Sequence, residues 1–200
     1  MRIKYFLIVS LGLFISHSGA QNFFEDAIVY KDADVIFIKN KKLAGNNLLP
    51  NGKTKFDYVG IVFIEDGKPV IYHATEPVSK SSLEDFMSLS EDGHFKVKRL
   101  FDKTLLTEQA IQTMHTFAKA KLNSHYDSRL TLTSDEVYNA EFIYKIYQSS
   151  IGLALASPKT FADYKNDPLS IEFLKEAYGE NIMNEKLIVV GDIYHSEFME

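Results

Sequence analysis

The chain has 200 residues, a formal net charge of −5 at pH 7 and no cysteine. Without cysteine it can form no disulfide, no thiolate metal site and no thiol nucleophile. The acidic balance and the lack of a Lys/Arg-rich block argue against nucleic acid as a partner, because such binding depends on neutralising phosphates.

The first twenty residues (1–20) predict a secretory signal peptide. A basic start precedes an apolar core of about 11 residues, which is shorter than the roughly 20 residues that span a membrane. Ser18 and Ala20 are small residues that flank the expected cleavage site. We therefore expect a mature chain that begins at Gln21, has no transmembrane segment after processing and is periplasmic or secreted. A retained membrane anchor is the alternative.

The next part of the chain predicts three strands. The β-branched run Asp34–Ile38 predicts the first strand, and Lys39–Thr54 is a loop with several turn signals. Tyr58–Ile64 predicts the second strand. Glu65-Asp66-Gly67-Lys68 is typical of a tight hairpin turn, so Pro69–His73 is expected to pair with the second strand.

A helix is predicted from Ser82, with Leu83, Phe86, Met87 and Leu89 facing inward. Phe95–Leu100 alternates and predicts another strand.

Two longer helices and a final strand complete the prediction. Thr107 is the expected N-cap of a helix that runs to about Leu122. Thr133 and Glu136 fit a capping box that would start the next helix. Leu187–Val190 predicts the last strand, with Gly191-Asp192-Ile193 leading to the tail. The whole pattern predicts an α+β fold, a small antiparallel sheet packed by helices.

Five short segments, in order, match the motifs of one family. On these segments the chain resembles the permuted papain-like amidases (YaeF/YiiX-like, within the NlpC-type superfamily). The family motifs are Gly-Asp-Ile-Val-Phe, Ser-His-Val-Gly-Ile-Val, Val-Ile-His-Ala, Gly-x-x-Tyr-Asp and Tyr-Cys-Ser-Glu-Leu-Val. The matching segments here are Ala33–Phe37, Asp57–Val62, Ile71–Ala74, Asn123–Asp127 and Tyr138–Ile143. The resemblance implies a single, circularly permuted papain-like domain over residues 21–200.

The resemblance also implies where a site should lie. In that family a thiolate at a helix N-terminus is the nucleophile, a histidine on the facing strand is the base, and a third polar residue orients the histidine. Asn139 stands at the nucleophile position and Tyr58 at the base position, while His73 is retained as the orienting residue. Glu141 matches the glutamate behind the nucleophile, and Tyr126 matches the tyrosine of the fourth motif. These five residues are the expected ligand cleft, a degenerate active site.

Neither replacement preserves the family's chemistry. Asparagine has no nucleophilic oxygen or sulfur at neutral pH, and tyrosine, with an ordinary pKa near 10, is a poor general base. We therefore expect an inactive member without catalytic residues or a cofactor. The resemblance implies a small amide- or acyl-containing ligand, such as a cell-wall peptide or a lipid.

Two other functions stay open. An active hydrolase could use Ser134, Thr133 or Ser124 with His73 as base, and a hydroxyl within hydrogen-bond reach of His73 would favour it. A purely structural or interaction protein would fill the cleft with its own side chains, as core residues satisfied by single hydrogen bonds. The remaining histidines show no metal-ligand spacing, so no metal is expected from them.

Overall fold

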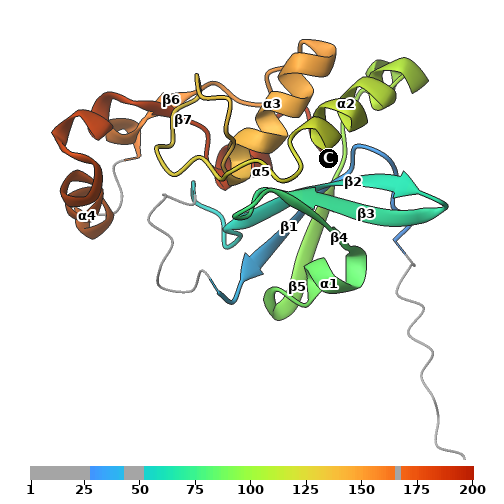
Figure 1. Cartoon of the computed structure of the whole chain (residues 1–200), viewed down its shortest axis with the longest axis horizontal. Helices are drawn as coiled ribbons and strands as arrows, with labels where there is room; N and C mark the ends of the chain where they lie inside the picture. Colours follow the sequence, from blue (N-terminus) through green and yellow to red (C-terminus); the bar gives the residue numbers. More distant parts are fainter. Residues whose placement is uncertain (1–27, 43–51, 165–167) are drawn as a thin grey trace, which may run out of the picture.

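The computed structural model describes residues 28–42, 52–164 and 168–200, and the predicted signal peptide lies outside this part. Its centre is a five-stranded antiparallel sheet with the order β4-β3-β2-β1-β5, as the sequence predicts for the fold class (Figure 1). The strands are β1 (Val35–Asn40), β2 (Tyr58–Glu65), β3 (Lys68–His73), β4 (Ser79–Ser82) and β5 (Ser90–Lys98).

The predicted hairpin between β2 and β3 is confirmed. Glu65 pairs with Lys68, and the two residues between them, Asp66 and Gly67, both have a positive φ (50° and 74°). A two-residue turn with both φ values positive matches the twist of the flanking strands, which is why Asp-Gly favours it. The turn fixes the register that later places Tyr72 opposite Ile61.

The two faces of the sheet are covered by different helices (Figure 1). The helices α2 (Glu108–Ala120) and α3 (Asn139–Ile151) cover the face that carries Val59, Ile61 and Phe63. The short helix α1 (Leu83–Met87) covers the other face. Its buried Phe86 belongs to the cluster made by Ile36, Ile38, Tyr58, Val62 and Ile71.

The start of β1 is tied to α3 and to Arg99. Ala33 has a φ of 64°, at the position where the family motif carries glycine, and its carbonyl accepts a 2.6 Å hydrogen bond from Tyr147 of α3. The buried Asp34 receives two hydrogen bonds from Arg99, at 2.9 and 2.8 Å. The first of the matched motifs therefore has a structural role.

The predicted helix start at Ser82 and the predicted N-cap Thr107 are confirmed, and Ser82 proves to be an N-cap as well. The Ser82 hydroxyl accepts from the Asp85 N–H at 3.0 Å, and the Thr107 hydroxyl accepts from the Ala110 N–H at 3.2 Å. The strand expected at Phe95–Leu100 begins earlier, because β5 already pairs with β1 at Ser90.

The predicted capping box Thr133–Glu136 is wrong, because α3 begins only at Asn139. Residues 127–131 form a loop fixed by Asp127, whose carboxylate accepts from the N–H groups of Arg129, Leu130 and Thr131. The N-terminal cap of α3 is instead made by Glu141, which accepts from the Tyr138 N–H at 3.0 Å.

The expected strand Leu187–Val190 is mostly absent. Only β7 (Lys186–Leu187) pairs, with β6 (Lys159–Thr160), and residues Val190–Tyr194 form the helix α5. The Asp192 carboxylate accepts from the Val189 N–H at 2.9 Å, which caps the first turn of α5. The apolar run Leu187–Val190 predicts a strand, but the cap made by Asp192 favours a helix that begins at Val190.

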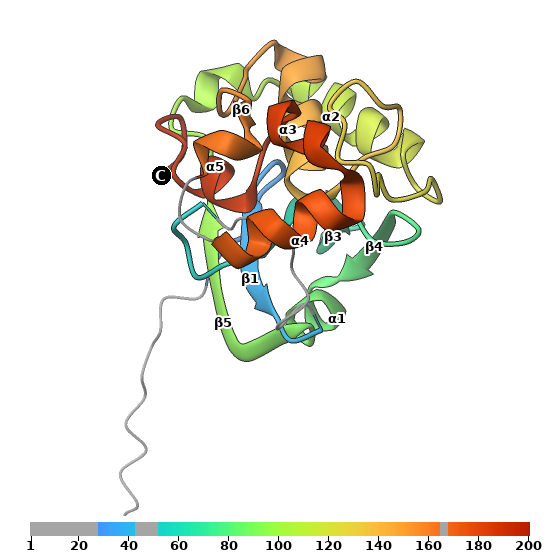
Figure 2. The same ribbon diagram turned by 90° about the vertical axis from the view of Figure 1, so that its left-hand side faces the viewer.

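The remaining elements are short. They are the 3₁₀ turns η1 (Lys103–Leu105), η2 (Phe161–Asp163) and η3 (Glu180–Asn184), and the helix α4 (Pro168–Tyr178). The helix α4 lies at one side of the molecule, away from α1 (Figures 1 and 2). Within the described residues, none of the helices combines the length and the apolar character that a bilayer crossing needs.

Candidate functional site

Tyr58 and His73 lie side by side on the α1 face of the sheet. The Tyr58 hydroxyl is 2.8 Å from His73 Nδ1 and donates to the Ala74 carbonyl at 3.1 Å. The Tyr58 ring also stacks on Phe86 of α1, with ring centroids 5.8 Å apart. The residue expected at the base position is thus a phenol that is bonded to His73.

His73 is held by a second hydroxyl. Its Nε2 atom is 2.8 Å from the hydroxyl oxygen of Ser81 on β4. His73 is only 3% exposed, and this burial lowers its pKa from 6.5 to about 4. The imidazole is therefore neutral at pH 7, and both of its nitrogens have partners.

Asn139 begins α3 and bonds to the backbone of β2 on both sides of Tyr58. Its Oδ1 atom accepts from the Val59 N–H at 3.1 Å, and its Nδ2 atom donates to the Asp57 carbonyl at 2.8 Å. The β2–β3 pairing starts only at Ile61, so the β3-facing groups of β2 before that point lie outside the ladder. The carboxamide therefore satisfies groups that β3 leaves without a partner.

Tyr126 and Glu141 also surround the start of α3. The Tyr126 phenol lies near the backbone N–H of Asn139, and burial raises the pKa of Tyr126 to about 12. Glu141 is fully buried, its Oε1 lies 2.8 Å from Lys145 Nζ, and burial raises its pKa to about 7 against the opposing pull of Lys145.

The five expected site residues therefore lie in two groups rather than one open set. Tyr58 bonds to His73, whereas Asn139, Tyr126 and Glu141 gather at the start of α3. Burial leaves Tyr58 4%, Asn139 6% and Glu141 0% exposed, and only Tyr126 is half-buried. That these residues line a ligand cleft stays a prediction.

The serine bonded to His73 is not among the three that the sequence suggested. The Ser124 hydroxyl donates to the Lys121 carbonyl at 2.7 Å, and the Ser134 hydroxyl accepts from the Glu136 N–H. Ser81 lies in a run of polar residues, and no sequence pattern marked it as a site residue. Only the pairing of β4 with β3, which sets Ser81 opposite Ile71, brings it to His73.

The comparisons with known proteins place these residues in a family. Residues 29–185 match the family described as "Permuted papain-like amidase enzyme, YaeF/YiiX, C92 family". The chain belongs to this family. It is 27% identical over 157 residues to the "Uncharacterized protein YiiX" of Escherichia coli strain K12, covering 78% of this chain and 77% of that protein.

A solved structure is similar to this permuted papain-like protein over most of its length. The crystal structure of the metalloprotein yiiX from Escherichia coli O157:H7 superposes with a TM-score of 0.76, covering 85% of this chain and 94% of that one, at 22% identity. This likeness confirms the predicted fold. In the described part of the present chain, no three His, Asp or Glu side chains gather as a metal site.

Proposed function

We propose that this protein is an exported family member that has lost thiol-dependent amide hydrolysis and retains a ligand of the family's class. That ligand is a small amide- or acyl-containing molecule, a cell-wall peptide or a lipid. The observation that supports the loss most directly is the Asn139 carboxamide, both of whose polar atoms bond to the β2 backbone.

The chemistry of the replaced positions supports the same conclusion. A nucleophile of this kind needs a hydroxyl or thiol group whose proton a base can remove, and Asn139 has neither group. Burial raises the pKa of Tyr58 above its ordinary value, so its phenol stays protonated at neutral pH and cannot act as a base.

A structural or interaction protein is the second candidate, favoured by the burial of Tyr58, His73 and Asn139. Their polar atoms bond to one another or to the backbone, as expected for a cleft filled by its own side chains. Under this alternative no small ligand accompanies the protein.

Mass spectrometry of the exported mature protein distinguishes the two candidates. Material extracted from the purified folded chain should contain a peptide or lipid in near-stoichiometric amount if the protein is a binder. The control is the same extraction after refolding from denaturant, which should release the ligand. Folded protein that carries nothing supports the structural alternative.

An activity assay tests the loss of chemistry separately. Peptide and acyl amides should show no turnover with the purified protein. Amide turnover that disappears in His73→Ala would contradict the proposal.

A further inference from the structure

His73 lies between two hydroxyl groups, one at each ring nitrogen. Tyr58 Oη is 2.8 Å from Nδ1 and Ser81 Oγ is 2.8 Å from Nε2. Ser81 reaches the histidine because it pairs with Ile71, two residues before His73 on β3, and alternate strand residues share a face. The result is a serine, an imidazole and a phenol in one hydrogen-bonded row.

The Ala74 carbonyl bears on the direction of these hydrogen bonds. A phenol has one proton, and the Ala74 carbonyl can only accept it. With that proton on the Ala74 bond, Nδ1–H donates the bond between His73 and Tyr58, whose direction the 2.8 Å distance alone leaves open. In a neutral imidazole with a proton on Nδ1, Nε2 is an acceptor, so the Ser81 hydroxyl donates to it. In this tautomer Nε2 has a free electron pair that faces the Ser81 hydroxyl, as a general base requires.

We propose that Ser81 is a hydroxyl nucleophile that accepts acyl groups from activated esters, with His73 as its general base and Tyr58 as the positioning residue that fixes the tautomer of His73. The site uses neither Asn139 nor a thiol. It therefore extends beyond the proposed function and does not depend on a ligand at α3.

The acyl transfer balances without a cofactor. Ser81 Oγ forms a bond to the carbonyl carbon while its proton moves to His73 Nε2. The bond from that carbon to the leaving oxygen then breaks, the proton passes from Nε2 to the leaving oxygen, and an alcohol departs. Because burial keeps His73 a weak base, we expect good leaving groups to be needed and the acyl-serine to be long-lived.

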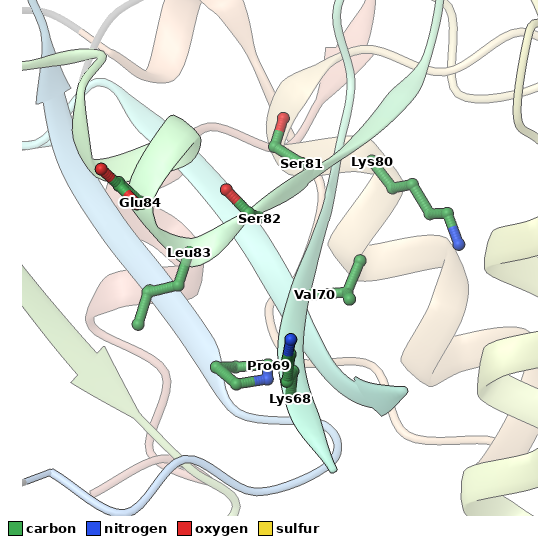
Figure 3. Close-up of a pocket in the computed structure, with 8 residues that line it drawn as sticks. All are labelled: Lys68, Pro69, Val70, Lys80, Ser81, Ser82, Leu83 and Glu84. Carbon is green, nitrogen blue, oxygen red and sulfur yellow. The ribbon is translucent and has the colours of Figure 1, made fainter. Parts of the chain in front are cut away.

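A groove beside Ser81 offers room for the acyl part. Ser81 is partly exposed and helps to line a groove of about 450 Å³ at the sheet edge, between the start of β3 and the end of β4 (Figure 3). Its apolar lining comes from Pro69, Val70 and Leu83. Ser82 does not share the imidazole, because its hydroxyl donates to Asp85 Oδ2 at 2.7 Å.

Labelling with a fluorophosphonate tests this proposal on the mature full chain. The serine oxygen forms a bond to phosphorus, fluoride leaves, and the proton goes to His73. We expect one adduct per chain, located on Ser81 by peptide mass mapping and absent from Ser81→Ala. The matched control is Ser79→Ala on the same strand and the same face, whose hydroxyl bonds to Thr75 and not to a histidine. It should label at the wild-type rate.

The role of the imidazole is tested with folded variants, checked by circular dichroism. His73→Gln should lower the labelling rate on the order of 100-fold, the usual contribution of a general base. Tyr58→Phe should lower it on the order of tenfold or more, because the tautomer is no longer fixed. The wild-type rate should stay constant from pH 8 to about pH 5, since His73 remains neutral.

Nitrogen-15 shifts of His73 provide a readout that does not depend on reactivity. They should show the proton on Nδ1 in the wild type, and a shift toward the Nε2-protonated form in Tyr58→Phe. An Nε2–H tautomer in the wild type, no adduct on Ser81, or an adduct rate unchanged by His73→Gln would each overturn the proposal.

Discussion

Replacing Asn139 with alanine should cost the protein a large part of its stability. The change removes both partners of the β2 backbone, the acceptor for Val59 N–H and the donor to Asp57 C=O. Each of the two buried groups left without a partner costs about 1–3 kcal/mol, so the free energy of unfolding should fall by about 2–6 kcal/mol. A typical domain has only about 5–15 kcal/mol in total.

Urea unfolding, followed by circular dichroism and by tyrosine fluorescence, measures this loss, because the chain has no tryptophan. Gln148→Ala is the matched control: it removes a carboxamide from the same helix at an exposed position, and should change stability by less than about 0.5 kcal/mol. Asn139→Asp separates the two bonds, since it keeps an acceptor for Val59 and loses the donor to Asp57.

Helix propensity works against the expected loss, because alanine is the better helix former. A large loss in Asn139→Ala therefore reports the hydrogen bonds to β2. If Asn139→Ala unfolds within about 0.5 kcal/mol of Gln148→Ala, the carboxamide does not hold α3 to the sheet, and the structural reasoning at this position is wrong.

Four further outcomes are expected. The pKa of Glu141 rises on folding from 4.5 to about 7, so the wild type loses stability as pH rises from 4.5 to 7. In urea titrations the free energy of unfolding of Glu141→Gln, relative to that of the wild type, should therefore increase by up to about 3 kcal/mol over this range. The pKa of His73 falls on folding from 6.5 to about 4, so the wild type gains stability as pH rises from 4 to 6.5. The stability of His73→Gln minus that of the wild type should therefore decrease with pH over this range, whereas the same difference for Glu141→Gln increases. A difference that does not change with pH would contradict the shift. Gly60→Ala would place a Cβ 2.5 Å from Ile71 Cγ2, and thermal unfolding should show a loss of about 1–3 kcal/mol. N-terminal sequencing of exported protein should find Gln21, and a chain that still starts at Met1 would exclude cleavage.

Local chemistry explains which parts of the fold could be predicted. The Asp66-Gly67 turn, the helix start at Ser82 and the N-cap Thr107 are decided within a few residues, and the structure has them where the sequence indicates. The failures have a different origin. Thr133 and Glu136 fit a capping box, yet Asp127 holds the preceding loop and Glu141 caps α3 instead.

The candidate site could be predicted only in part, because its contacts join distant residues. The family motifs pointed to Tyr58, His73 and Asn139, but not to the way in which each is bonded. Asn139 lies far along the chain from Val59, and Ser81 meets His73 through strand pairing. Neither contact leaves a periodic or spacing signal in the sequence.

The bonds of Asn139 also bear on how this lineage can change. Under the proposed loss of thiol chemistry, a single change of Asn139 to cysteine would remove both hydrogen bonds to β2, while Tyr58 would still stand at the expected base position. Such an intermediate would be less stable and would have no base for its thiol. A return to thiol chemistry would therefore need both substitutions together, or a stabilising change elsewhere first.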